Sequence, residues 1–224
     1  MAHKNIDFKL YLITDRKLVA RHGSTELAEV SSLVTAVRHA LKGGVKAVQL
    51  REKTLSTRVL LRLACKLREL TAVYSARLFI NDRLDIALAA GADGVHLTRE
   101  SIPADAVRRA VDNRLLIGVS THSIKEAREA QDAGADFLTF GPVYRTPSKL
   151  KFGKPVGTGM LKRVCREMSI PVFALGGVKE SKIAEVLKTG AYGVSMISGI
   201  FRNDDIKKKT TGIMNKLGSH QMTE

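Results

Sequence analysis

Short apolar runs alternate with amphipathic stretches along most of the chain. Eight runs are rich in β-branched and aliphatic side chains, and turn residues flank each of them. Their nearly continuous apolar character is typical of strands that are covered on both faces, as in a parallel sheet. The predicted strands are 8–15, 47–52, 77–82, 94–98, 116–121, 137–143, 172–177 and 193–198.

The stretches between the runs have helical periodicity. In 25–44 the apolar residues recur at helical spacing from Leu27 to Leu41, after a capping Ser24 or Thr25 and before a glycine pair. Ser123 and Glu126 have the spacing of a capping box. Four similar joints, "GGVKAVQL", "GADGVHL", "GADFLTF" and "GAYGVSM", each lead from a helix end into a strand.

This repetition predicts an α/β protein built as one (β/α)₈ TIM barrel. We expect a single catalytic domain over 1–206, followed at 207–224 by a basic tail that is helical and then frays. The alternative is an open, doubly wound sheet. The even spacing of the eight runs, and the lack of a glycine-rich dinucleotide motif after the first, favour the barrel.

Composition limits the class of protein and its surroundings. No run of 18 apolar residues exists, and the start of the chain lacks the apolar core of a secretory signal, so we expect a cytoplasmic protein without membrane contact. Cys65 and Cys165 lie in helical patterns and are expected to be reduced core thiols.

The chain of 224 residues carries a formal net charge of +15. Such an excess suits either nucleic acid or small substrates with several phosphates, or it is solvated surface only. Aromatic residues make up only 5% and tryptophan is absent, so platforms for stacking bases are scarce. We therefore expect phosphorylated small molecules rather than nucleic acid as partners, and the sequence leaves a homo-oligomer open.

In a β/α barrel, the loops after the strands carry the active site. Gly176-Gly177 follows the seventh run and Ser198-Gly199 the eighth. Loops at these two places often bind phosphate through backbone N–H groups, so we predict a phosphate site there. Alternatively, the glycines only make tight turns.

A second group of polar residues lies at the end of the second run and after the sixth. Gln49, Arg51 and Lys53 are two apart, so they share one face while the chain stays extended. Arg51, Lys53 and Lys149 have the charge and geometry that bind phosphate. They predict a second anion site, with a solvated basic surface as the alternative.

Three further residues allow two readings each. Asp82, beside Asn81, suits Mg²⁺ that shares a substrate phosphate, but it also suits a cap for the next helix. His122 is either an acid or base, or a structural histidine at a helix start. His96 lies inside a predicted strand and is expected to be a core histidine.

Taken together, these residues resemble the thiamine-phosphate synthase family, which has a TIM-barrel fold. The resemblance runs in order from Leu10 to Phe201. It is carried by "YLITDR", "VQLREK", "INDRLDIALAAGADGVHL", "IGVSTHSIKEAREAQDAGADFLTFGPVYRTPSK", "IPVFALGGV" and "GVSMISGI".

The resemblance implies a cytoplasmic transferase of thiamine biosynthesis. Such an enzyme joins hydroxymethylpyrimidine diphosphate to thiazole phosphate and releases pyrophosphate, with Mg²⁺ as cofactor. It implies that Arg51 and Lys149 stabilise the departing pyrophosphate and that Asp82 binds Mg²⁺. The implied substrate-binding residues are Gln49, Arg51, Lys53, Asn81, Ser120, Thr146, Ser148, Lys149, Gly176, Gly177, Ser198 and Gly199.

The stretch "VHLTRESIP" departs from the family pattern. Ser101 stands where the family has a second metal-binding acid, and Glu100 lies one residue earlier. A hydroxyl is a weaker Mg²⁺ ligand than a carboxylate. The alternative is therefore a metal-independent thiazole tautomerase of the same family, an isomerase in which His122 is the acid or base. A non-catalytic binder of phosphates or nucleic acid is a third hypothesis.

Overall fold

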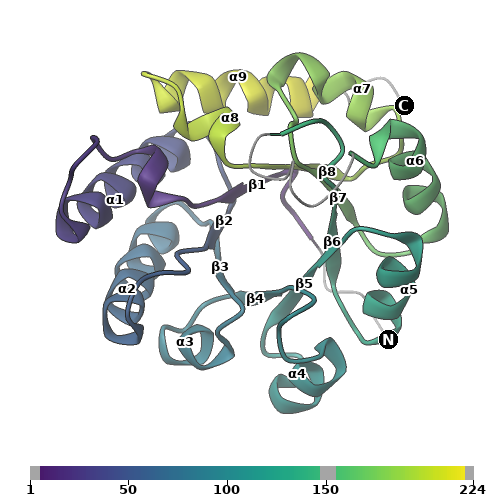
Figure 1. Ribbon diagram of the computed structural model, residues 1–224, viewed down its shortest axis with the longest axis horizontal. Helices are drawn as coiled ribbons and strands as arrows, with labels where there is room; N and C mark the ends of the chain where they lie inside the picture. The colour runs from purple at the N-terminus through teal and green to yellow at the C-terminus, as the bar shows by residue number, and fades with distance from the viewer. Residues whose placement is uncertain (1–5, 147–154, 220–224) are drawn as a thin grey trace.

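The strands close into one parallel barrel. In the computed structural model, which describes residues 6–146 and 155–219, the strands pair in chain order and the last pairs with the first (Figure 1). This confirms the predicted TIM barrel over the open sheet, which would have left two unpaired edges. The strands are β1 (Leu10–Ile13), β2 (Ala47–Leu50), β3 (Arg77–Asn81), β4 (Gly94–Leu97), β5 (Leu116–Thr121), β6 (Phe137–Phe140), β7 (Val172–Leu175) and β8 (Gly193–Met196).

Helices surround the barrel on the outside (Figure 1). The first of them begins as the sequence predicts, because the Thr25 hydroxyl accepts the Ala28 N–H at 3.3 Å. The α-helices are α1 (Glu26–Lys42), α2 (Thr57–Val73), α3 (Leu84–Ala89), α4 (Ala104–Val111), α5 (Ile124–Asp132), α6 (Gly157–Glu167), α7 (Ile183–Leu187), α8 (Ser198–Phe201) and α9 (Ile206–Gly218). The 3₁₀ helices of the described residues are η1 (Arg16–Leu18) and η3 (Glu180–Lys182).

The basic segment near the end of the chain is part of this ring. Ile213 and Leu217 of α9 are buried, and α9 packs against α1 and α7. Gly43 at the end of α1 lets the two helices approach closely, because a Cβ there would lie 2.7 Å from the Cβ of Thr210. In the part of the chain that the structure describes, no helix is long and apolar enough to cross a membrane.

An aromatic layer fills the barrel toward the amino-terminal ends of its strands. Neighbouring rings have centroids 5.2 to 6.2 Å apart and many meet edge to face, a favourable geometry for aromatic pairs. The rings displace water from the barrel interior, and each buried ring contributes on the order of 2 kcal/mol through burial of apolar surface. They belong to Phe8, Tyr11, Phe79, Phe137 and Phe173, all fully buried or nearly so.

Glycines on neighbouring strands make room for these rings. A Cβ on Gly94 would lie 2.5 Å from the Phe79 ring, and a Cβ on Gly193 would lie 2.8 Å from the Phe173 ring. Each glycine pairs directly with its phenylalanine in the strand register. The glycines inside these strands are therefore explained by packing.

The two cysteines are free thiols, as expected. Both are half-buried, Cys65 on α2 and Cys165 on α6. Burial raises the pKa of the Cys165 thiol to about 11, so this thiol stays protonated near neutral pH and is a poor nucleophile.

Candidate functional site

The carboxyl ends of the strands bring several predicted site residues into one layer of the barrel. Gln49 lies on β2, Asn81 on β3 and Ser120 on β5, two residues beyond Ala47, Phe79 and Gly118 respectively. Ala47 and Phe79 belong to the buried cluster of the aromatic layer, and a Cβ on Gly118 would lie 2.4 Å from the Phe137 ring. Residues two apart on a strand point to the same side. The interior of the barrel therefore changes from apolar to polar within two residues.

A chain of hydrogen bonds crosses this polar layer from β2 to β6. Gln49 Nε2 donates to the Tyr11 hydroxyl at 3.2 Å, and this hydroxyl lies 3.3 Å from His96 Nδ1. On the other side of the ring, His96 Nε2 lies 2.9 Å from Ser120 Oγ, which in turn lies 3.2 Å from Thr139 Oγ1. The sequence indicated Gln49 and Ser120 as substrate-binding residues but assigned no role to Tyr11 or Thr139.

His96 is buried, which confirms the expected core histidine. Burial first, and the charge of Arg51 second, lower the pKa of His96 to about 3, so its ring is neutral near pH 7. A neutral imidazole has one donor and one acceptor. The Tyr11 hydroxyl proton is satisfied if Nδ1 accepts it, and His96 Nε2–H then donates to Ser120. The buried Ser195 Oγ on β8 has no hydrogen-bond partner among the described residues.

A buried ion pair joins the loops that follow β1 and β2. Arg16 Nη1 lies 3.2 Å from Glu52 Oε2, and the two side chains are only 7% and 3% exposed. Burial raises the pKa of Glu52 against the opposing effect of its hydrogen bonds. Arg51 and Lys53, the predicted anion-binding residues, lie on either side of Glu52 in the chain, half-buried and exposed respectively.

Asp82 has an unusual backbone conformation. Its φ is +67°, in the left-handed region that few residues other than glycine adopt, and its N–H donates to the His96 carbonyl at 2.9 Å. The next helix begins at Leu84 with Arg83 at its cap and no side-chain cap bond, so the reading of Asp82 as a helix cap is wrong. Strained conformations of this kind concentrate at functional sites, which supports a role for this exposed carboxylate.

The Ser101 hydroxyl is hydrogen-bonded within its own loop. The Thr98 N–H donates to Ser101 Oγ at 2.8 Å, and the two hydroxyls lie 3.1 Å apart. Glu100 beside it is exposed. Among residues 6–146 and 155–219, no group of three or more His, Cys, Asp or Glu side chains is placed to hold a metal ion. Asp82 is thus the carboxylate to which a magnesium prediction applies, with the remaining ligands from phosphate or water.

His122 is held at the start of α5. Its Nδ1–H donates to the Gly141 carbonyl, which leaves Nε2 for proton exchange. Glu126 Oε2 accepts the His122 N–H at 2.8 Å, and Ser123 Oγ accepts the Glu126 N–H at 3.2 Å. The predicted capping box therefore forms with one change, because its carboxylate reaches His122 instead of the cap residue.

The glycine pair after β7 packs against the loop after β6. Gly176 and Gly177 have φ of +91° and +68°. A Cβ on Gly176 would lie 2.6 Å from Pro142 Cβ, and one on Gly177 would lie 2.8 Å from Tyr144 Cβ. The tight-turn reading is sufficient to explain both glycines, and phosphate binding by them stays a prediction.

The other predicted residues lie near these loops or outside the described chain. Thr146 is half-buried at the end of the described loop after β6. Ser198 is exposed and Gly199 half-buried in α8, directly after β8. Ser148 and Lys149 lie outside the described residues.

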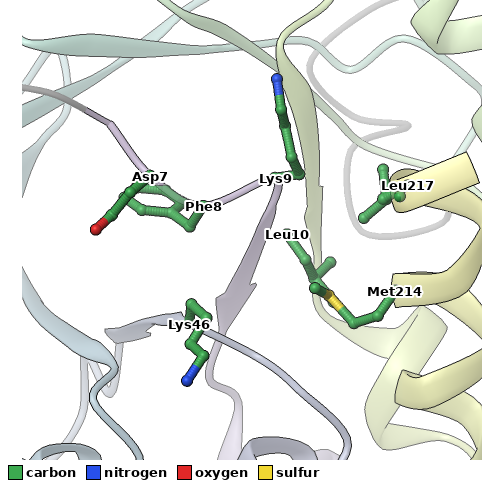
Figure 2. A pocket seen from close by; sticks show the side chains of 8 residues that line it. Asp7, Phe8, Lys9, Leu10, Lys46, Met214 and Leu217 are labelled. Carbon is green, nitrogen blue, oxygen red and sulfur yellow. The ribbon is translucent and has the colours of Figure 1, made fainter. Parts of the chain in front are cut away.

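A cavity of about 140 Å³ lies at the opposite end of the barrel (Figure 2). The segment leading into β1, the side chain of Lys46 and the end of α9 line it. Because it lies at the amino-terminal end of β1, it does not belong to the candidate site.

These features define the class of protein. A closed β/α barrel with basic residues and an exposed carboxylate on the loops at its carboxyl end has the arrangement of an enzyme that acts on phosphorylated small molecules.

Comparisons with known proteins name the family. The profile of the family "Thiamine monophosphate synthase" matches residues 10–200. A relative from Geobacter sulfurreducens with a provisional thiamine-phosphate synthase name is 50% identical over 93% of this chain and 94% of its own. The thiamine-phosphate synthase of Clostridium novyi is 40% identical over 94% of this chain and 99% of its own. The structure of thiamine phosphate pyrophosphorylase from Pyrococcus furiosus has a TM-score of 0.83 and 37% identity over 95% of this chain and 96% of that one.

The chain therefore belongs to the thiamine-phosphate synthase family, and the resemblance seen in its motifs is confirmed.

Proposed function

We propose that the protein joins hydroxymethylpyrimidine diphosphate to thiazole phosphate, yielding thiamine phosphate and pyrophosphate. The observation that carries the proposal is the nearly full-length match to proteins that bear the synthase name. The bond between the pyrimidine methylene carbon and the diphosphate oxygen breaks, and its electron pair leaves with pyrophosphate. The lone pair of the thiazole nitrogen then forms the new carbon–nitrogen bond.

The loops at the carboxyl end of the barrel form its mouth. The basic residues on these loops stabilise the leaving group. Arg51 offers a planar fork and Lys53 a point charge to the diphosphate, and Asn81 and Lys149 complete this set. Such fixed charges act most strongly where negative charge develops in the transition state. Gln49 and Ser120 bind the pyrimidine ring. The thiazole phosphate lies near the loops after β6, β7 and β8, with Thr146, Ser148, Gly176, Gly177, Ser198 and Gly199 as its ligands.

Asp82 is the residue that would hold Mg²⁺. Its carboxylate is exposed at the mouth, and Mg²⁺ is commonly bound by one or two carboxylates together with substrate phosphates. When bound, the ion neutralises charge on the diphosphate. The Ser101 hydroxyl already accepts a hydrogen bond from the Thr98 N–H, so Glu100, exposed one residue earlier, is the acid that this loop offers beside Asp82.

The thiazole tautomerase alternative is not favoured. The curated relatives named above carry the synthase name. A tautomerase also has little physical use for Gln49, Lys53 and Asp82, because its reaction involves no diphosphate.

An assay of the purified protein tests the proposal. It supplies both substrates, with and without Mg²⁺, and follows release of pyrophosphate together with formation of thiamine phosphate. We expect release that depends on Mg²⁺ and is lost in Lys149→Ala, because the departing charge loses a fixed cation. Lys66→Ala, which changes an exposed lysine on α2, is the matched control and should keep full turnover.

Two results would contradict the proposal. The first is an absence of pyrophosphate release under both conditions. The second is conversion of the thiazole precursor isomer in place of coupling, which would identify the tautomerase.

A further inference from the structure

Glu52 lies between the two predicted anion-binding residues, just after β2 ends at Leu50. Its side chain is buried, with 6% exposed, whereas Arg51 is half-buried and Lys53 is exposed in the turn that follows. Anion binding by Arg51 and Lys53 does not explain why an acidic residue, Glu52, is buried between them.

The Glu52 carboxylate joins the loop after β2 to the loop after β1. Its Oε1 accepts the Thr14 hydroxyl at 2.7 Å and the Arg16 backbone N–H at 3.1 Å. Its Oε2 accepts Arg16 Nη1–H at 3.2 Å. Both oxygens are therefore bonded to the loop that follows β1.

The same group of bonds reaches the backbone of the predicted anion site. The Arg51 N–H donates to Thr14 Oγ1 at 2.8 Å. The Thr14 hydroxyl thus donates one hydrogen bond to Glu52 and accepts another from the Arg51 backbone. Arg16 Nη2 donates to Thr54 Oγ1 at 3.0 Å, and Arg16 Nε donates to Glu29 Oε2 of α1 at 2.7 Å. The chain is thus tied to the first loop on both sides of Lys53, by the Arg51 backbone amide and by the Thr54 side-chain hydroxyl.

This ion pair is unusual within the molecule. Among residues 6–146 and 155–219, Arg16 and Glu52 are the only Arg, Lys, Asp or Glu residues that are buried. Burying two charges costs desolvation that their attraction barely repays, so such a pair is weak evidence for stability. Supporting hydrogen bonds of this kind are, however, what fixes binding side chains in a productive geometry.

We propose that Arg16 and Glu52 are positioning residues, which hold Arg51 and Lys53 in the geometry that binds the diphosphate of the substrate. They do not touch the substrate themselves. The identity of the anion as the substrate diphosphate rests on the proposed function. The binding of a diphosphate group as such does not.

Glu52→Gln tests the proposal, because it keeps the shape of the side chain and removes the charge that accepts three hydrogen bonds. Calorimetric titration with inorganic pyrophosphate measures binding without turnover. We expect affinity to fall about tenfold or more, since small misplacements of binding groups are costly. In the coupled reaction, the KM for the pyrimidine diphosphate should rise while the KM for thiazole phosphate stays within about twofold.

Asp136→Asn is the matched control for a loss of stability alone. Asp136 Oδ2 accepts Arg108 Nη2–H at 2.6 Å and the Ile117 N–H at 2.7 Å, directly before β6 and hence at the opposite end of the barrel. Its loss should lower the melting temperature as Glu52→Gln does. Its affinity for pyrophosphate should equal that of the unchanged protein.

A double variant keeps the test valid if Glu52→Gln does not fold. Arg16→Met combined with Glu52→Met removes both charges and fills the space with apolar atoms, an exchange that buried ion pairs often tolerate. We expect the same loss of pyrophosphate affinity in a folded protein.

The outcomes separate this proposal from the proposed function. Loss of pyrophosphate affinity in Glu52→Gln but not in Asp136→Asn, in a protein that shows no coupling activity, would support the positioning role and contradict the synthase. Unchanged affinity in the folded Glu52 variants, equal losses in both single variants, or no pyrophosphate binding by the unchanged protein would each overturn the positioning role.

Discussion

The two ends of the barrel interior differ sharply although the same strands build both. On β6, Phe137 packs in the aromatic layer and Thr139, two residues later, belongs to the polar network. On β3 the same step leads from Phe79 to Asn81. The amino-terminal half of the interior is therefore apolar and the carboxyl-terminal half polar, and the change takes one step of two residues along a strand.

The acidic residues of the two ends differ in the same way. At the amino-terminal end, the carboxylate of Asp93 accepts the Leu78 N–H at 2.7 Å and lies 3.3 Å from Arg68. At the carboxyl end, Asp82 is exposed on a strained backbone. One carboxylate satisfies the backbone and an arginine, whereas the other is presented to solvent, where a ligand can reach it.

The largest expected effect comes from exchanging these acids for amides. Asp82→Asn should lower turnover by about 10²- to 10³-fold with little change in stability, because it removes charge from the mouth only. Asp93→Asn should lower the free energy of unfolding by about 1–3 kcal/mol and leave turnover largely intact, because a partly buried hydrogen bond to a charged group is weakened. Steady-state kinetics and urea unfolding of both variants make the comparison. A reversed pattern would contradict the division between the two ends.

A second prediction concerns the aromatic layer. Phe137→Ala should lower the free energy of unfolding by about 3–5 kcal/mol, because it leaves a cavity among four other rings. At a temperature where the variant is folded, its affinity for inorganic pyrophosphate should stay near that of the unchanged protein. A loss of binding with normal stability would show that the layer shapes the site directly.

A third prediction concerns the pH dependence of stability that comes from His96, which is about 1.4 kcal/mol for each pH unit. The unfolded chain takes up a proton on this histidine near pH 6.5, whereas the folded protein resists protonation until about pH 3. Between these values the unfolded state binds more protons, so stability falls as the pH falls, by about 1.4 kcal/mol per pH unit for one proton. The contribution is complete above pH 6.5. Urea unfolding from pH 7 to 4 measures how the free energy of unfolding changes with pH. In His96→Gln this slope should decrease by the amount that one proton contributes, and an unchanged slope would contradict a neutral His96.

The order of strands and helices could be predicted from the sequence, because turn residues and helical spacing mark each boundary. The division of the barrel interior could not. All four residues of β2 and of β4 are buried, so periodicity cannot distinguish the interior of the barrel from its outer side. The register decides which residues face the Phe79 and Phe137 rings.

The site was only partly predictable for a related reason. Gln49 lies near the carboxyl end of β2, and Arg51 and Asp82 follow β2 and β3; this position alone indicates function in a barrel. Arg16 and Glu52 read as ordinary charged loop residues, because their pairing joins positions that are distant in sequence. The network through Tyr11 depends on which side of β1 is internal, and that too needs the register.

The pairing of β8 with β1 bears on how the chain folds as it is synthesised. The ladder between Leu10 and Val194 cannot form until the ribosome has made nearly the entire chain. Until then β1 and the newest strand both present unpaired edges, which favour association with other chains. A truncated product that ends before Gly193 would keep these edges permanently, so we expect incomplete chains to aggregate and the barrel to complete its folding only after its last strand emerges.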